Sequence, residues 1–177
     1  KEVKCSEDDW YCRGKLESEN ILREYSEKNG WELIILRITN VYGTDFRRKG
    51  EILPNFFDKM INNELLKIYG GGKQKRDRIF IDDLVQASIC SLKDNVNGVF
   101  NIGSGKSYST LEVAKIMGKI LKTKYKVEFP DSLMDNRKDN LLNIEKTKKV
   151  LGFKPKVSFK KGLKIVINSW KNEQRKK

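Results

Sequence analysis

The chain has 177 residues, enough for one domain with a buried core or for parts of two domains. Its residues are 38% hydrophobic and 34% charged, which indicates a soluble globular protein. No apolar run approaches the ~20 residues of a membrane span, so we expect no membrane partner. The net charge of +13 is compatible with nucleic acid or with an anionic substrate such as a nucleotide diphosphate. Because the basic residues are spread out and no zinc-finger or RNP-type motif is present, nucleic acid is the minor alternative.

Histidine and cysteine content narrows the chemistry further. Histidine is absent, which excludes His-based triads and most zinc sites. We therefore predict no metal site, and Tyr, Lys, Asp and Glu remain as acid/base candidates. The three cysteines have no paired spacing, which favours reduced thiols in a cytoplasmic protein.

The first predicted element is a helix from about residue 8 to 28, with a capping box at residues 6–9 and Gly30 at its end. Tyr11 and Lys15 are four residues apart and so share one face. A phenol has a pKa of about 10, and a nearby ammonium lowers it by favouring the phenolate. Such a pair can exchange a proton with a sugar hydroxyl, although the same spacing arises by chance where the Tyr is merely packed.

A short apolar run at residues 33–38 predicts a strand buried on both faces, as in a parallel sheet. Polar Thr39 and Asn40 follow it. Polar residues at the carboxyl end of a parallel strand occupy the place where open α/β sheets bind ligands. Helix, turn and strand make half of a βαβ unit, so the predicted fold class is α/β.

The rest of the chain continues to alternate between helical and extended patterns. Gly103-Ser104-Gly105-Lys106 is not a phosphate-binding P-loop, because position 100, where that motif needs Gly, is Phe. The segment instead predicts a turn from a strand into the next helix. We expect helices at 51–62, from a cap at Asp82-Asp83, from a capping box at 109–112, from near 144 to Gly152 and at 158–170, and strands at 67–69 and 125–129.

Five ordered blocks resemble the extended short-chain dehydrogenase/reductases, and more narrowly the NAD-dependent nucleotide-sugar epimerase/dehydratase family, including enzymes similar to UDP-glucose 4-epimerase. Together the blocks extend over most of the chain. They are Tyr11-x-x-x-Lys15; Leu36-Arg37-x-x-Asn40-Val41-Tyr42-Gly43; residues 66–84 with Arg76-Asp77; residues 98–105; and Arg137-Lys138-Asp139 with Lys148-x-x-Leu151-Gly152-Phe153-x-Pro155.

The resemblance implies the C-terminal part of a Rossmann-like parallel sheet with a small α/β substrate-binding domain. Residues 1–43 and 77–103 would be the remnant of the NAD(P)-binding domain, and residues 44–76 and 104–177 the nucleotide-sugar domain. The Gly-rich dinucleotide fingerprint and its ribose-binding acid are not in the sequence. We therefore expect the N-terminal dinucleotide-binding half to be absent, NAD binding to be weak or absent, and the exposed sheet edge to promote a homodimer or higher self-association.

The resemblance also implies roles for individual residues. Tyr11 would deprotonate the sugar 4-hydroxyl, and Lys15 would bind the nicotinamide ribose and lower the pKa of Tyr11. Val41 would contact the cofactor, which is NAD or alternatively NADP. The substrate, a nucleoside-diphosphate sugar, would contact Asn40, Ile52, Arg76 and Arg137. Alternatively, Arg76 is an ion-pair partner of a nearby Asp, and Arg137 is a solvated loop residue.

The favoured activity is that of an epimerase that oxidises and re-reduces the sugar at C4 through a 4-keto intermediate. A nucleotide-sugar 4,6-dehydratase or a related enzyme is the first alternative. A non-catalytic sugar-nucleotide binding or interaction module is the alternative from another class. Residues 51–54 depart from the Asn-Leu-x-Pro of many galactose-type epimerases, which leaves the sugar open.

Overall fold

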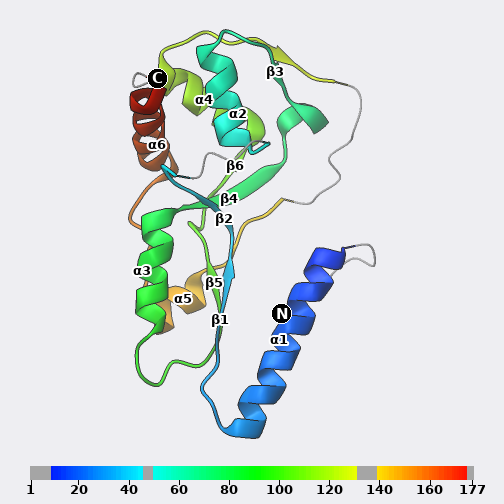
Figure 1. The fold of residues 1–177 in the computed structure, drawn as a ribbon, viewed down its shortest axis with the longest axis vertical. Helices are drawn as coiled ribbons and strands as arrows, with labels where there is room; N and C mark the ends of the chain where they lie inside the picture. The colour runs from blue at the N-terminus through cyan, green and yellow to red at the C-terminus, as the bar shows by residue number, and fades with distance from the viewer. Residues whose placement is uncertain (1–8, 46–49, 131–138, 175–177) are drawn as a thin grey trace.

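The chain alternates helices with short strands, which confirms the predicted α/β class. The structure is a computed structural model that describes residues 9–45, 50–130 and 139–174 (Figure 1). Its elements in chain order are α1 (Trp10–Asn29), β1 (Ile34–Ile38), β2 (Asn40–Tyr42), α2 (Ile52–Ile61), β3 (Leu66–Lys67), the 3₁₀ turn η1 (Tyr69–Gly72), β4 (Lys75–Phe80), α3 (Ile81–Ser91), β5 (Gly98–Ile102), β6 (Ser107–Ser109), α4 (Thr110–Leu121), β7 (Val127–Glu128), α5 (Glu145–Val150) and α6 (Phe159–Gln174).

The predicted apolar strand is β1, and it pairs in parallel with β5 in the register Ile34↔Gly98 to Ile38↔Ile102. The prediction that both of its faces are buried is wrong, because its residues are half-buried and Ile38 is 47% exposed. The physical reason is that β5 covers one edge only, and no other strand of the described residues pairs with β1. Its second edge and part of its surface therefore remain open.

Two further small sheets follow. Strand β2 runs parallel to β4, with Asn40 opposite Arg78 and Tyr42 opposite Phe80. Strand β4 pairs on its other edge with β6, in the antiparallel direction. Strands β3 and β7 form a separate parallel pair. The polar stretch that follows β1 therefore enters a second sheet at once, so that the ends of β1, β2 and β4 lie close together (Figure 1).

Two hydrophobic clusters hold the elements in place. One lies among α2, α4 and α6, where the rings of Phe57 and Trp170 meet edge to face at 5.3 Å and both are almost fully buried. The other lies against β5 and contains Phe100, Leu151 and Phe153. The interleaved two-domain division stays a prediction, although each cluster supplies a core of its own.

Helix ends confirm some of the predicted signals and correct others. Gly30 ends α1 in the left-handed conformation at φ 66°, and Ser109 forms the predicted capping box with Glu112. At the start of α1, Asp9 is the N-cap and accepts a hydrogen bond from the Cys12 amide. Ser6, the predicted start of the box, lies outside the described residues.

The predicted Asp82-Asp83 cap is also wrong, since Phe80 is the N-cap of α3 and both aspartates lie in the first turn. Buried Asp83 instead accepts hydrogen bonds from the amides of Lys156 and Val157, and so attaches α3 to the segment before α6. The expectation of reduced thiols holds for Cys90 but is wrong for Cys12, which is disulfide-bonded. Within the described part of the chain, no helix combines the length and apolar character needed to cross a membrane.

Candidate active site

Tyr11 and Lys15 lie in the first two turns of α1, as their spacing predicts. The Lys15 ammonium is 5.7 Å from the centre of the Tyr11 ring. Tyr11 is 78% exposed, so its ring is not the packed tyrosine of the alternative interpretation. The phenol and the ammonium are thus adjacent and open to a ligand.

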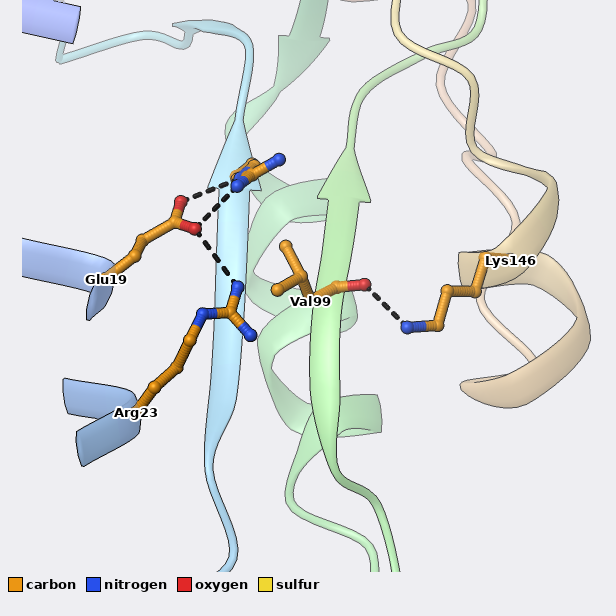
Figure 2. A network of polar contacts seen from close by, with 5 residues as sticks. Glu19, Arg23, Val99 and Lys146 are labelled. Atoms are coloured by element: carbon orange, nitrogen blue, oxygen red, sulfur yellow. Dashed lines mark hydrogen bonds and ion pairs between the residues drawn. The ribbon is translucent and has the colours of Figure 1, made fainter. Parts of the chain in front are cut away.

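Glu19 continues the same four-residue spacing and attaches α1 to the sheet. Its carboxylate accepts hydrogen bonds from Nε of Arg37 at 2.7 Å and from Nη2 at 2.5 Å. Arg23, one turn further along α1, adds a longer ion pair at 3.5 Å. Figure 2 shows Glu19 reaching from α1 to β1, while on the other side of the sheet Lys146 of α5 donates to the Val99 carbonyl at 3.0 Å.

The pair with Arg37 is both a hydrogen bond and a charge interaction. It lowers the pKa of the Glu19 carboxyl, chiefly through the hydrogen bonds from Arg37 and in spite of partial burial. The same bonds raise the pKa of Arg37 above its ordinary value. Each partner therefore stabilises the charged form of the other, which fixes one side of α1 toward β1.

This orientation places the Tyr–Lys pair relative to the sheet. Arg37 is the last residue but one of β1, and α1 runs antiparallel to β1 (Figure 1). Tyr11 precedes Glu19 by eight residues, or about 12 Å along a helix that rises 1.5 Å per residue. Each four-residue step also rotates by about 40°, so Lys15 is turned by about 40° and Tyr11 by about 80° from the side of α1 that carries Glu19, and both lie past Arg37 in the direction of the carboxyl end of β1.

The substrate candidates on the strands lie on neighbouring elements. Asn40 begins β2 and is exposed, opposite Arg78 of β4. Arg76 is half-buried two residues earlier on β4, opposite Tyr108 of β6. The structure thus brings Asn40 and Arg76 close together, next to the end of β1.

The other candidates are placed differently. Val41 of β2 is half-buried against the cluster around Phe100. Ile52 begins α2 and packs partly against the helical cluster. Arg137 lies outside the described residues. Val41 and Ile52 therefore pack against the two hydrophobic clusters.

Asp77 was not predicted as a site residue, yet it joins the strand ends. Its buried carboxylate accepts hydrogen bonds from the Ser104 hydroxyl at 2.6 Å, the Ser104 amide at 3.0 Å and the Gly105 amide at 3.2 Å. A Cβ at Gly103 would be only 2.7 Å from this carboxylate, so glycine is required for the approach. The predicted turn at residues 103–105 is therefore real, and it leads into β6 before α4 begins.

The backbone of Asp77 continues the network. Its carbonyl accepts from the Thr39 hydroxyl at 2.9 Å, and its amide donates to the Asn140 carbonyl at 2.8 Å. Asp77 thereby fixes β4 to the end of β1 and to the turn after β5. The position of Asp77 after Arg76 in the sequence does not indicate this role. The role of Glu19, by contrast, could have been predicted, because Glu19 continues the four-residue spacing of Tyr11 and Lys15.

Taken together, these features define an α/β protein that carries acid/base and anion-binding groups near the carboxyl end of β1 and the amino ends of β2 and β4. Among the described residues, no group of His, Cys, Asp and Glu side chains is arranged to hold a metal ion. The Tyr–Lys pair can move a proton, and the arginine of β4 can bind an anion. The arrangement suits a reaction on a polar, negatively charged substrate.

Solved structures similar to this chain include nucleotide-sugar epimerases. The UDP-N-acetylglucosamine 4-epimerase of Methanobrevibacter ruminantium M1, in complex with UDP-N-acetylmuramic acid, has a TM-score of 0.83 at 27% identity; the match covers 97% of this chain and 55% of that one. The UDP-glucuronic acid 4-epimerase of Bacillus cereus, in complex with UDP-glucuronic acid and NAD, has a TM-score of 0.82 at 27% identity, over 98% of this chain and 58% of that one.

Curated relatives point the same way. The putative UDP-glucose 4-epimerase of Methanocaldococcus jannaschii is 33% identical over 93% of this chain and 54% of its own length. The dTDP-4-dehydro-6-deoxyglucose reductase of Escherichia coli is 34% identical over 90% and 51%. The UDP-glucuronic acid decarboxylase 4 of Arabidopsis thaliana is 30% identical over 91% and 37%.

Residues 3–103 match the NAD dependent epimerase/dehydratase family. The chain belongs to this family, as its sequence blocks predict. It spans between 37% and 54% of the length of the three curated relatives, in agreement with the expected likeness to one part of such enzymes.

Proposed function

We propose that this chain supplies the proton-transfer and substrate-binding groups of an NAD(P)-dependent nucleoside-diphosphate-sugar epimerase that acts at C4 of the sugar. The observation that carries the proposal is the adjacent, exposed Tyr11–Lys15 pair on α1, the helix that the Glu19–Arg37 ion pair attaches to β1. Family membership and the UDP-sugar ligands of similar structures support the substrate class.

In the proposed reaction, Tyr11 would take the proton of the 4-hydroxyl while the C4 hydride passes to a nicotinamide cofactor, and a 4-keto sugar would form. The Lys15 ammonium lies beside the Tyr11 ring, where it can donate hydrogen bonds to hydroxyl groups of the ligands. After the sugar turns over in the site, the hydride returns to the other face and Tyr11 gives its proton back to the oxygen. Asn40, Arg76 and Arg137 hold the nucleotide, and Ile52 packs beside it.

NAD or NADP would accept and return the hydride. The residues present fit the nicotinamide end of such a cofactor, because Lys15 is a free donor for ribose hydroxyls beside the exposed Tyr11, with Val41 proposed as an apolar contact. The Gly-rich turn that holds a dinucleotide pyrophosphate is not in this sequence. Firm cofactor binding therefore needs groups other than those of these 177 residues.

The relatives support a second candidate function, a different reaction on a nucleotide sugar. They include a decarboxylase and a reductase of nucleotide sugars, and the family's name includes dehydratases. A 4,6-dehydratase shares the first oxidation at C4 and then eliminates water. A binding module without redox chemistry would retain Asn40 and Arg76 but would not need Tyr11.

We also propose self-association. Large apolar side chains of α1 and of the turn that follows it are exposed, and one edge of β1 has no strand partner among the described residues. Burying such surface against a second copy would remove it from water. The exposed set is Trp10, Ile21, Leu22 and Tyr25 of α1, with Trp31 after the helix. A cytoplasmic location is likewise a proposal.

Product analysis tests the activity. The full-length protein that contains this chain is incubated with NAD and UDP-glucose, UDP-N-acetylglucosamine or UDP-glucuronic acid, and the products are resolved by chromatography. We expect conversion of one of these to its C4 epimer without net change in NADH. A 4-keto-6-deoxy or decarboxylated product would select the second candidate, and nucleotide-sugar binding without any product would select the binding module.

A further inference from the structure

Arg78 is a buried cation that forms no ion pair with a carboxylate of the described residues. It lies in the middle of β4 and is only 8% exposed. Its Nη1 donates to the carbonyls of Arg76 at 3.3 Å and Tyr108 at 3.5 Å, both long contacts. Within the described part of the chain, no carboxylate forms an ion pair with it.

Such a site is costly for the free protein. Burial, and then the positive charge of Arg76, lower the pKa of Arg78 to about 10. Charged groups are rarely buried unless they are paired, because removing them from water costs several kcal/mol. An anion beside Arg76 and Arg78 would offset the repulsion between the two guanidiniums.

Arg78 still has donors available for that anion. A guanidinium carries five N–H donors, and the contacts above use one nitrogen. No fully enclosed side-chain nitrogen of the described residues lacks a partner, so the nitrogens of Arg78 that have none are reached by solvent. They can therefore be reached by a ligand.

The strand geometry shows where this ligand would lie. Side chains two residues apart on a strand point to the same face, so Arg76 and Arg78 share a face of β4. Asn40 is opposite Arg78 on the adjacent parallel strand and adds a polar side chain to the same face. Asp77 points to the opposite face, where it binds the 103–105 turn.

We propose that Arg78 binds the diphosphate of the nucleotide ligand together with Arg76 and Asn40. This inference rests on the proposed function and adds to it a binding residue that the sequence did not single out. A diphosphate offers several acceptor oxygens and up to two negative charges to two guanidiniums, each of which can donate in pairs.

The test is UDP binding to the 177-residue chain, measured by titration calorimetry at constant ionic strength. Arg78→Gln should weaken UDP binding about tenfold or more, the loss expected for a charge-assisted hydrogen bond. Arg78→Lys keeps the charge and should lose less. Lys160→Gln removes the same charge from an exposed site on α6 and should leave UDP affinity unchanged.

The sugar is tested separately with UDP-glucose and UDP-glucuronic acid. Equal losses for both in Arg78→Gln support a diphosphate contact, whereas a loss confined to UDP-glucuronic acid would overturn it in favour of a carboxylate contact. Weaker UDP binding in Arg76→Ala but not in Arg78→Gln overturns this inference and leaves the proposed function intact. If the parent chain binds no UDP at all, the proposed substrate site fails as well.

Folding is checked by the melting temperature of each variant without ligand. Should Arg78→Gln not fold, Arg78→Lys carries the test, because a lysine cannot form the paired hydrogen bonds of a guanidinium. A clear loss of UDP affinity in the folded lysine variant supports the inference, and parent-like affinity contradicts it.

Discussion

Glu19 of α1 and Arg37 of β1 form a two-pronged ion pair across the space between helix and sheet (Figure 2). No residue of α1 is buried, so side-chain packing does little to orient the helix. The Glu19–Arg37 pair is therefore an important contact for setting its orientation relative to the sheet. The proposed proton-transfer residues Lys15 and Tyr11 precede Glu19 on the same helix, about one and two turns away. The Glu19–Arg37 contact would therefore help to position them relative to β1.

Replacing Glu19 by Gln should disturb this arrangement. The pair is partly buried, and its loss leaves Arg37 without its carboxylate, so we expect about 1–2 kcal/mol lower stability. In the full-length protein, turnover should fall more than nucleotide affinity, because Tyr11 and Lys15 lose their orientation. Arg23→Gln, which removes only the longer and more exposed pair, should cost about 0.5 kcal/mol or less. Equal effects of the two variants in urea unfolding would contradict this role of Glu19.

The same pair predicts a pH dependence of stability. Arg37 lowers the pKa of folded Glu19 below its ordinary value of 4.5. A group with a lowered folded pKa stabilises the protein above the unfolded pKa, and this contribution is lost as pH falls through the folded value. The difference in unfolding free energy between the parent chain and Glu19→Gln should therefore be constant near neutral pH and should shrink below about pH 4.5. A difference that does not change with pH would show that the ion pair is not its source.

The sequence predicted much of this fold because its local signals are strong. The apolar run of β1, the Ser109–Glu112 capping box and Gly30 at the end of α1 each act over a few residues. The errors arose where distant contacts decide. Asp83 was expected to cap its own helix, but it binds amides more than seventy residues away.

For the site, sequence patterns identified residue types but not their supports. The four-residue spacing of Tyr11 and Lys15 is visible in any helix. By contrast, Asp77 and Arg78 acquire their roles from strand pairing, which no local pattern specifies. The partial burial of β1 could not be predicted from its own residues either, because it depends on which elements pack against the strand.

Asp77→Asn should be strongly destabilising. The buried carboxylate accepts three hydrogen bonds from Ser104 and Gly105, and the variant's amide group replaces one acceptor oxygen by a donor. We expect a loss of about 2–4 kcal/mol, measured by urea denaturation, together with weaker UDP binding as β4 shifts. The control Asp82→Asn changes an exposed side chain in the first turn of α3 and should cost less than about 0.5 kcal/mol. Parent-like stability of Asp77→Asn would show that the turn does not depend on this carboxylate.

The 177-residue chain should bind NADH weakly or not at all. Dinucleotide affinity depends strongly on a Gly-rich turn and helix N-terminus that hold the pyrophosphate, and this sequence lacks that motif. A fluorescence titration with NADH should show no saturation at micromolar concentrations, while light scattering should show self-association. Saturable micromolar binding by a monomer would contradict both expectations.

The most direct test of the central claim is turnover of the full-length protein with Tyr11→Phe. This variant removes one hydroxyl from an exposed residue, so folding and UDP-sugar affinity should be unchanged. If Tyr11 is the acid and base, turnover should fall about 10²–10⁴-fold, the usual contribution of a positioned proton-transfer group. Tyr25→Phe, which removes the same hydroxyl from another exposed tyrosine of α1, should keep parent-like turnover. Turnover of Tyr11→Phe close to that of Tyr25→Phe would contradict the proposed mechanism.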